Sequence, residues 1–102
     1  MRRMTFPTQE QISLTGVLYA LSDPTRLQIF KGLATNGEQM CCSFNIPIAK
    51  STLSHHFKVL RDAGVIYTRL EGAQSLNSLR REDLDVRFPG LLDAVLQVSE
   101  PN

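Results

Sequence analysis

The fold is decided by one stretch of the chain, Ser51-Thr52-Leu53-Ser54-His55-His56-Phe57-Lys58-Val59-Leu60-Arg61-Asp62-Ala63-Gly64. Its apolar residues Leu53, Phe57 and Leu60 recur at the spacing that lines one face of a helix. Gly64 follows at the position where a left-handed residue often ends a helix. The other faces keep short hydroxyls, histidine and lysine. We therefore expect a helix from Lys50 to Ala63 with one buried stripe and a small polar outer face.

The first of three helices expected before this stretch runs from Thr8 to Leu21. Thr8 and Gln11 fit a capping box, in which each side chain satisfies a backbone N–H of the first turn. The apolar residues of this segment follow the spacing of a single helical stripe. They are Leu14, Val17, Leu18 and Leu21.

The second expected helix begins at Asp23, which can cap its first turn, and at Pro24, which suits its first position. Asn36-Gly37 ends this helix. A short third helix is expected from Glu38 to Phe44, closed by Asn45-Ile46-Pro47 because the residue before a proline disfavours helical geometry. The buried face of the second helix is expected to contain Leu27, Phe30 and either Leu33 or Ala34.

The segment after Gly64 predicts a β-hairpin and a closing helix. Residues 65–70 are rich in strand formers, residues 71–74 form a turn, and residues 75–79 return as a second strand. Residues 80–88 are polar and carry no clear pattern. A last apolar stripe follows Pro89-Gly90 and contains Leu91, Leu92, Val95 and Leu96. The expected order is α-α-α-α-β-β-α in one domain over residues 1–102, a mainly α fold with a β-hairpin wing of the winged helix-turn-helix type.

Such a helix with a small polar outer face fits the major groove of DNA, which is about 12 Å wide. Short hydroxyls allow a close approach to the bases, and lysine and the amides at the helix start hold phosphates. In the hairpin, Arg69 and Gln74 are either minor-groove or phosphate contacts or a solvated tip. Ser51 and Thr52 alternatively serve only to start the helix. His56, beside Phe57, is expected to be a packed or backbone-bonded histidine rather than a ligand. The expected DNA contacts on the helix are Lys50, Ser51, Thr52, Ser54, His55 and Lys58.

Two sequence motifs follow one another along the chain. The first is Asp23-Pro24-Thr25-Arg26 followed by Ile29, and the second is the stretch from Ser51 to Gly64 quoted above. Together they resemble the arsenic-repressor (ArsR/SmtB) family of bacterial winged-helix transcriptional regulators, over roughly residues 12–98. The resemblance implies a homodimer, built by the first and last helices, that binds operator DNA. It also implies repression of a nearby gene until an effector releases the protein.

The two apolar stripes favour a dimer independently of that resemblance. They offer more apolar surface than a chain of 102 residues readily hides. The alternative is that both stripes close the core of a single chain. In a dimer, two recognition helices about 34 Å apart would read an inverted repeat. The expected interface residues are Leu14, Val17, Leu18 and Leu21 with Leu91, Leu92, Val95 and Leu96.

The formal net charge of +1 argues against a protein held on DNA by bulk charge. The charge is unevenly distributed, however. Residues 50–81 hold six basic and two acidic groups (+4), whereas residues 82–102 hold one basic and five acidic groups (−4). The positive segment contains the expected recognition helix and wing. We therefore expect modest non-specific affinity for DNA, with specificity supplied by base contacts and dimer geometry.

Cys41 and Cys42, which are adjacent, are the reactive feature of the sequence. Aligned with the metal-binding segment of the arsenic-repressor family, Cys42 matches the second of two cysteines, but Met40 occupies the position of the first. No histidine follows His56. We therefore predict no zinc, nickel or cobalt site and no cofactor. Vicinal thiols bind trivalent arsenic or become oxidised, so one hypothesis is a thiol-based arsenite or redox sensor; the other is two small packed hydrophobes.

Other protein classes are disfavoured by the sequence. No apolar run approaches the ~20 residues of a membrane span, and the segment Met1-Arg2-Arg3-Met4 is not followed by the apolar stretch of a signal peptide. We therefore expect a cytoplasmic protein with no membrane partner. The sequence contains neither a nucleotide-binding glycine loop nor a plausible catalytic triad, so we do not expect an enzyme. A winged-helix module that contacts only other proteins is the alternative to DNA binding.

Overall fold

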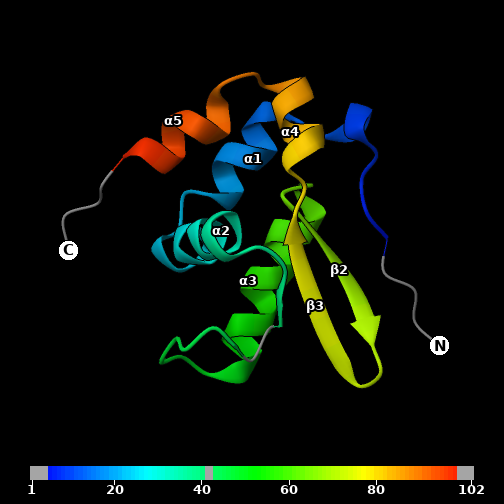
Figure 1. Ribbon diagram of the computed structural model, residues 1–102, viewed down its shortest axis with the longest axis vertical. Helices are drawn as coiled ribbons and strands as arrows, with labels where there is room; N and C mark the ends of the chain where they lie inside the picture. The colour runs from blue at the N-terminus through cyan, green and yellow to red at the C-terminus, as the bar shows by residue number, and fades with distance from the viewer. Residues whose placement is uncertain (1–4, 41–42, 99–102) are drawn as a thin grey trace.

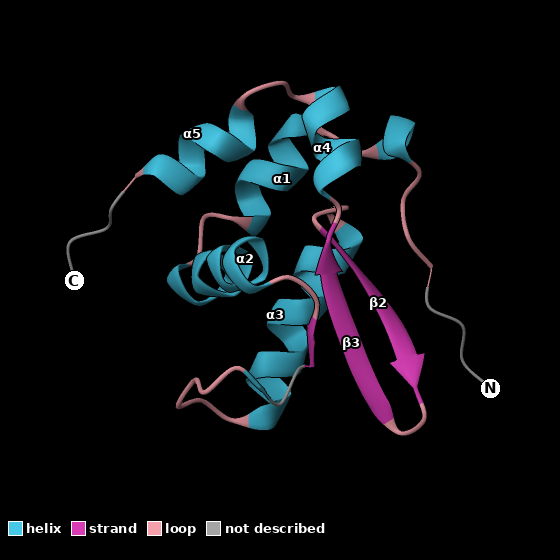
Figure 2. Cartoon of the chain, in the orientation of Figure 1, coloured by secondary structure: helices cyan, strands magenta, loops and turns pink. Residues whose placement is uncertain are grey.

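The computed structural model describes residues 5–40 and 43–98. A group of helices packs together, and a β-hairpin projects from it beside one of them (Figure 1). Figure 2 shows the same arrangement by secondary structure, with the long hairpin as the main β element. This is the mainly α winged helix-turn-helix fold that the sequence predicts. Its elements are η1 (Gln9–Gln11), α1 (Leu14–Ala20), α2 (Pro24–Asn36), β1 (Gln39–Met40), α3 (Lys50–Asp62), β2 (Ile66–Glu71), β3 (Gln74–Leu79), α4 (Arg81–Arg87) and α5 (Leu91–Gln97).

The helix expected from Thr8 to Leu21 is divided into η1 and α1. The capping residue Thr8 donates its N–H to Gln11 Oε1 at 2.9 Å, as the sequence predicts, but the chain becomes extended at Ile12. The Ile12 side chain is buried, and its carbonyl accepts two hydrogen bonds from Arg87, at 2.7 and 3.2 Å. A continuous helix would use that carbonyl internally. Ser13 then caps α1 by accepting from Gly16 N.

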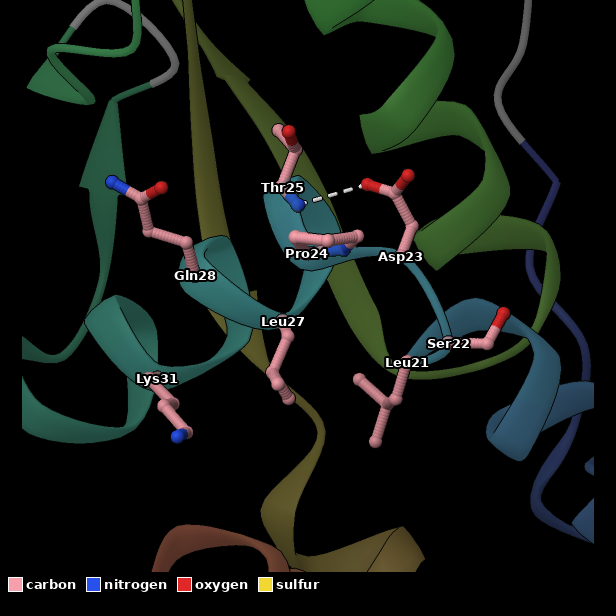
Figure 3. A pocket seen from close by; sticks show the side chains of 8 residues that line it. All are labelled: Leu21, Ser22, Asp23, Pro24, Thr25, Leu27, Gln28 and Lys31. Atoms are coloured by element: carbon pink, nitrogen blue, oxygen red, sulfur yellow. Dashed lines mark hydrogen bonds between the residues drawn. The ribbon is translucent and has the colours of Figure 1, made fainter. Parts of the chain in front are cut away.

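Helix α2 begins and ends where the sequence predicts. The Asp23 carboxylate accepts from Thr25 N at 2.9 Å and from Arg26 N at 3.1 Å, and the first of these bonds is drawn in Figure 3. Pro24 occupies the first helical position, where its missing N–H costs nothing. Gly37 ends the helix with a φ of 80°. The buried face of α2 consists of Arg26, Ile29, Phe30 and Leu33, whereas Leu27 and Ala34 are only partly buried.

The sheet has three strands in the order β1-β3-β2, all antiparallel. The hairpin pairs Ile66 with Leu79 and Glu71 with Gln74. The expectation of a helix from Glu38 to Phe44 is wrong at its beginning, because Gln39 and Met40 form β1. These two residues pair with Asn77 and Leu76, so they give an edge of β3 the backbone hydrogen-bond partners it would otherwise lack.

The core brings together residues of the five α-helices, α1 to α5. Leu53, Phe57 and Leu60 of α3 are buried, as their spacing predicts, and α3 ends before Gly64, whose φ is 83°. Helix α4, in the polar segment that carried no clear pattern, contributes Leu84. The buried hydrophobic residues of the described ranges are Ile12, Val17, Ala20, Ile29, Phe30, Leu33, Leu53, Phe57, Leu60, Val65, Ile66, Leu84 and Leu92.

Candidate nucleic-acid interface

The outer face of α3 carries the side chains expected to meet DNA. Leu53, Phe57 and Leu60 bury the inner face, and His56 and Val59 beside them are partly buried. The residues of the opposite face are turned toward solvent. The N-cap residue Ala49 supplies no side-chain hydrogen bond to the first turn, so that turn keeps N–H groups for an external acceptor. The exposed residues of this face are Lys50, Ser51, Thr52, Ser54, His55 and Lys58.

Lys58 forms an ion pair with Asp62, one helical turn further along α3. Lys58 Nζ lies 2.7 Å from Asp62 Oδ2, and the two side chains are 63% and 58% exposed. An ion pair this open to water contributes little to stability. The ammonium can therefore exchange the carboxylate for a phosphate at small cost.

Arg69 of the wing is exposed, but its guanidinium is already occupied. It donates to both carboxylate oxygens of Glu38, at 2.9 and 3.0 Å, and also to Glu71. The hydrogen bond from Arg69 lowers the pKa of Glu38, and the two carboxylates raise the pKa of Arg69. In this arrangement the expected DNA contact at Arg69 is balanced by two negative charges. Gln74 lies exposed beside the wing turn at the start of β3.

The positive segment 50–81 is largely neutralised by acidic partners. Arg80 pairs with Asp83 at 3.0 Å, and Arg81 pairs with Asp85 and Asp93. The partners of Arg80 and Arg81 come from the segment 82–102, whose formal charge is −4. Among the described residues, Lys50 and Arg61 take part in no ion pair. The positive surface is therefore concentrated on α3 rather than spread over the wing.

The two predicted dimer stripes are divided between the surface and the core. Leu14 and Leu18 of α1 are 45% and 47% exposed. Val17 and Leu92 are instead fully buried in the core of the single chain, so their side chains offer no surface to a partner. The other four are partly buried against the core: Leu21, Leu91, Val95 and Leu96. Tyr19, which the sequence reading missed, extends the exposed face of α1.

Cys41 and Cys42 lie outside the described residues, so the thiol hypothesis stays a prediction. Over residues 5–40 and 43–98, no three histidine, cysteine or acidic side chains gather in a group that could hold a metal ion. Over the same ranges, no helix has both the length and the apolar character needed to cross a membrane.

An open hollow of about 560 Å³ lies beside the turn between α1 and α2. In Figure 3 the side chains of Leu21, Leu27 and Lys31 extend on one side of it, and Asp23 stands at the start of α2. Its two charged side chains have structural partners, since Asp23 caps α2 and Lys31 Nζ donates to Val98 O at 3.0 Å.

Known proteins are similar to this chain in sequence and in fold. Residues 23–68 match the family model described as bacterial regulatory protein, arsR family. The chain is 33% identical over 95 residues to the uncharacterized HTH-type transcriptional regulator YceK of Bacillus subtilis (strain 168), covering 90% of this chain and 95% of that protein. It is 38% identical over 74 residues to an arsenical resistance operon repressor of Staphylococcus xylosus, covering 71% and 70%. The crystal structure of the transcriptional repressor BigR from Xylella fastidiosa superposes with a TM-score of 0.60 at 28% identity, covering 74% of this chain and 85% of that one.

Proposed function

This chain belongs to the arsR family of bacterial regulatory proteins and is a DNA-binding transcriptional regulator, and from that premise we propose how it works. Two copies form a homodimer, and each copy inserts α3 into the major groove of operator DNA. The dimer represses a neighbouring gene until an effector releases it. It acts in the cytoplasm and carries no catalytic activity.

The observation that carries the proposal is the outer face of α3. Its short hydroxyls, His55 and two lysines are exposed on a helix whose other side is anchored in the core. Small polar side chains let the helix approach base edges, and Lys50 and Lys58 supply charge for the phosphates.

Lys58→Ala tests this interface. The variant should bind all DNA sequences more weakly, with the slope of log affinity against log salt reduced by about one unit, because one phosphate contact is lost. The matched control is Asp62→Asn, which frees Lys58 from its ion pair and should bind at least as tightly as the parent. An unchanged slope in Lys58→Ala would remove this residue from the interface.

The homodimer is supported by the exposed Leu14 and Leu18 on one face of α1. The chain measures 35 × 35 × 21 Å, so two copies side by side can present their α3 helices to successive major grooves, about 34 Å apart. The sequence it reads is therefore an inverted repeat.

Leu18→Glu tests the dimer, because a buried carboxylate at the interface would be left without a partner. The variant should sediment as a folded monomer and lose most of its operator affinity. Val86→Glu, which alters an exposed apolar residue of α4, should leave the oligomeric state unchanged. A parent chain that is itself monomeric at micromolar concentration would overturn the proposal.

The effector is a small molecule or a thiol-reactive agent. Cys41 and Cys42 follow β1 directly in the sequence, and adjacent thiols are suited to trivalent arsenic or to oxidation. The variant with both cysteines changed to serine should no longer be released from DNA by arsenite or peroxide. A response equal to that of the parent would exclude the thiols as the sensor.

A further inference from the structure

Arg26 is a buried cation at the junction of α1, α2 and α3. The residue is only 6% exposed. Arg26 Nε donates to Ala20 O at 2.7 Å, and Nη2 lies 3.4 Å from Tyr19 O, so the guanidinium closes the carboxyl end of α1. Its central carbon also stands 5.3 Å from the centre of the Tyr19 ring. A buried charge needs such partners, because isolated burial is costly.

The remaining described contact of this guanidinium reaches the recognition helix. Arg26 Nη1 lies 3.1 Å from His56 Nδ1. An arginine has only donors, so His56 Nδ1 is the acceptor, and the imidazole proton is on Nε2. The charged and titratable neighbours of His56 are Arg26, Asp23 and His55. Asp23 Oδ2 is 3.8 Å from Nδ1, beyond hydrogen-bond distance, and the His55 ring centre is 6.1 Å away.

This hydrogen bond differs in kind from the other contacts that hold α3. Leu53, Phe57 and Leu60 pack by apolar burial, which depends on the area buried and has no preferred direction. A hydrogen bond weakens steeply when its angle changes. His56 lies between the exposed His55 and the buried Phe57, so a rotation that displaced His56 would also displace the outer face of α3.

We propose that Arg26 and His56 are positioning residues that set the rotation of the recognition helix about its own axis. Their hydrogen bond aligns the outer face of α3 with the base edges, although neither residue touches DNA. Arg26 also holds the end of α1, so the rotation of α3 is tied to the helix that carries Leu14 and Leu18. This last link rests on the dimer proposed above.

A merely structural role for the pair would give a different result. In that case the contacts of Arg26 only close the end of α1 and offset the cost of burying the charge. Loss of the His56 contact then lowers stability, but the molecules that remain folded bind DNA as before. Operator affinity measured per folded molecule separates the two roles. Conservative replacements at His56 separate them further, because the acceptor atom can be kept or moved.

His56→Asn and His56→Gln are the decisive pair. The Oδ1 of asparagine stands near the position of Nδ1 and can accept from Arg26, whereas the amide of glutamine lies one bond further out. The probe is a duplex selected by the parent protein from a random-sequence pool. His56→Asn should bind it within about twofold of the parent, and His56→Gln should bind about tenfold more weakly, as expected for losing a hydrogen bond to a charged group.

The salt dependence should be the same in both variants, because no phosphate contact is removed. Ile29→Val, which trims a buried side chain on the same helix as Arg26, is the control. It should lower stability and leave the affinity per folded molecule unchanged. Sedimentation of each variant reports separately whether the dimer forms, so failure of the dimer and failure of the positioning pair are distinguishable.

Two results would overturn the proposal. One is parental affinity in His56→Gln, which would mean that the hydrogen bond does not control the outer face. The other is equal weakening of His56→Asn and His56→Gln together with a smaller salt slope. That result would identify His56 as a direct contact to DNA.

Discussion

Arg69 joins the wing to the segment before β1 through a guanidinium that donates to both oxygens of Glu38 and to Glu71. All three side chains are exposed, so the link is screened by water and contributes little to stability by itself. Its effect is on geometry and charge. It fixes the direction of the arginine and cancels a positive charge on the part of the wing that could approach DNA.

The Glu38–Arg69 pair predicts a pH dependence. Arg69 lowers the pKa of Glu38 in the folded chain by hydrogen bonding to its carboxylate. A lowered pKa in the folded state means that the link is present at neutral pH and is lost as the pH falls through that lowered pKa. A carboxyl NMR titration should show Glu38 titrating below its ordinary range.

Arg69→Gln supplies the comparison for that titration. Without the guanidinium, the pKa of Glu38 should return toward its ordinary value. Identical Glu38 titration curves in the parent and in Arg69→Gln would show that the pair does not form in solution.

At the scale of an element, the end of α3 depends on a close approach to the first segment of the chain. Gly64 has a φ of 83°, and a Cβ built there would lie 2.5 Å from Ile12 Cγ1. Glycine is therefore required twice, once by the left-handed backbone and once by the space that Ile12 fills. Ile12 is also the residue at which the chain becomes extended between η1 and α1.

Gly64→Ala should accordingly destabilise the fold by about 3 kcal/mol, combining left-handed strain with overpacking. Gly90 offers a matched control, since its φ is 85° but a Cβ there would meet nothing within 4 Å. Gly90→Ala should cost only the left-handed strain, about 1–2 kcal/mol. Urea unfolding of both variants measures the difference in the free energy of unfolding. Equal decreases would mean that the contact with Ile12 does not contribute to the effect.

The elements that sequence predicts well are those with local signals. Asp23, Pro24 and Gly37 set the ends of α2, and the spacing of Leu53, Phe57 and Leu60 sets the inner face of α3. Strand β1 has no such signal, because Gln39 and Met40 become a strand only through pairing with distant residues of β3. Helix α4 has one buried residue, Leu84, which is too little for a periodic pattern.

In the candidate site, too, some features have a local sequence signal and others depend on tertiary contacts. The exposed outer face of α3 follows from helical spacing alone, and the pair of Lys58 with Asp62 lies at a spacing of four. The neutralisation of Arg69 depends on Glu38, which is far away in the sequence. The contact between Arg26 and His56 likewise needs the folded chain, since α2 and α3 meet only through tertiary packing.

At the scale of the whole molecule, the net charge of +1 results from matched pairs rather than from sparse charge. Arginines of the positive segment are held by acids on β2, on α4 and α5, and before β1. Affinity for DNA should therefore depend on the position of a removed charge more than on the net charge of the chain.

Two double variants with equal charge test this expectation. Glu38→Gln with Glu71→Gln frees Arg69 and raises the formal charge by two, from +1 to +3. Asp85→Asn with Asp93→Asn frees Arg81 and raises it by the same amount. The first variant should bind non-specific DNA more tightly, with a salt slope larger by about one unit. The second variant should bind non-specific DNA much as the parent does. An equal gain in affinity in both variants would mean that the net charge determines this affinity.

The small strand β1 also bears on the order in which the molecule assembles. Its residue Gln39 pairs with Asn77, 38 positions away, whereas the most distant pair of the hairpin, Ile66 with Leu79, is 13 positions apart. Closing the longer loop costs more chain entropy and delays contact formation. The hairpin should thus form first and β1 should join it last. The amides of Gln39 and Met40 should exchange with solvent before those of the hairpin, as the earliest part of the sheet to open.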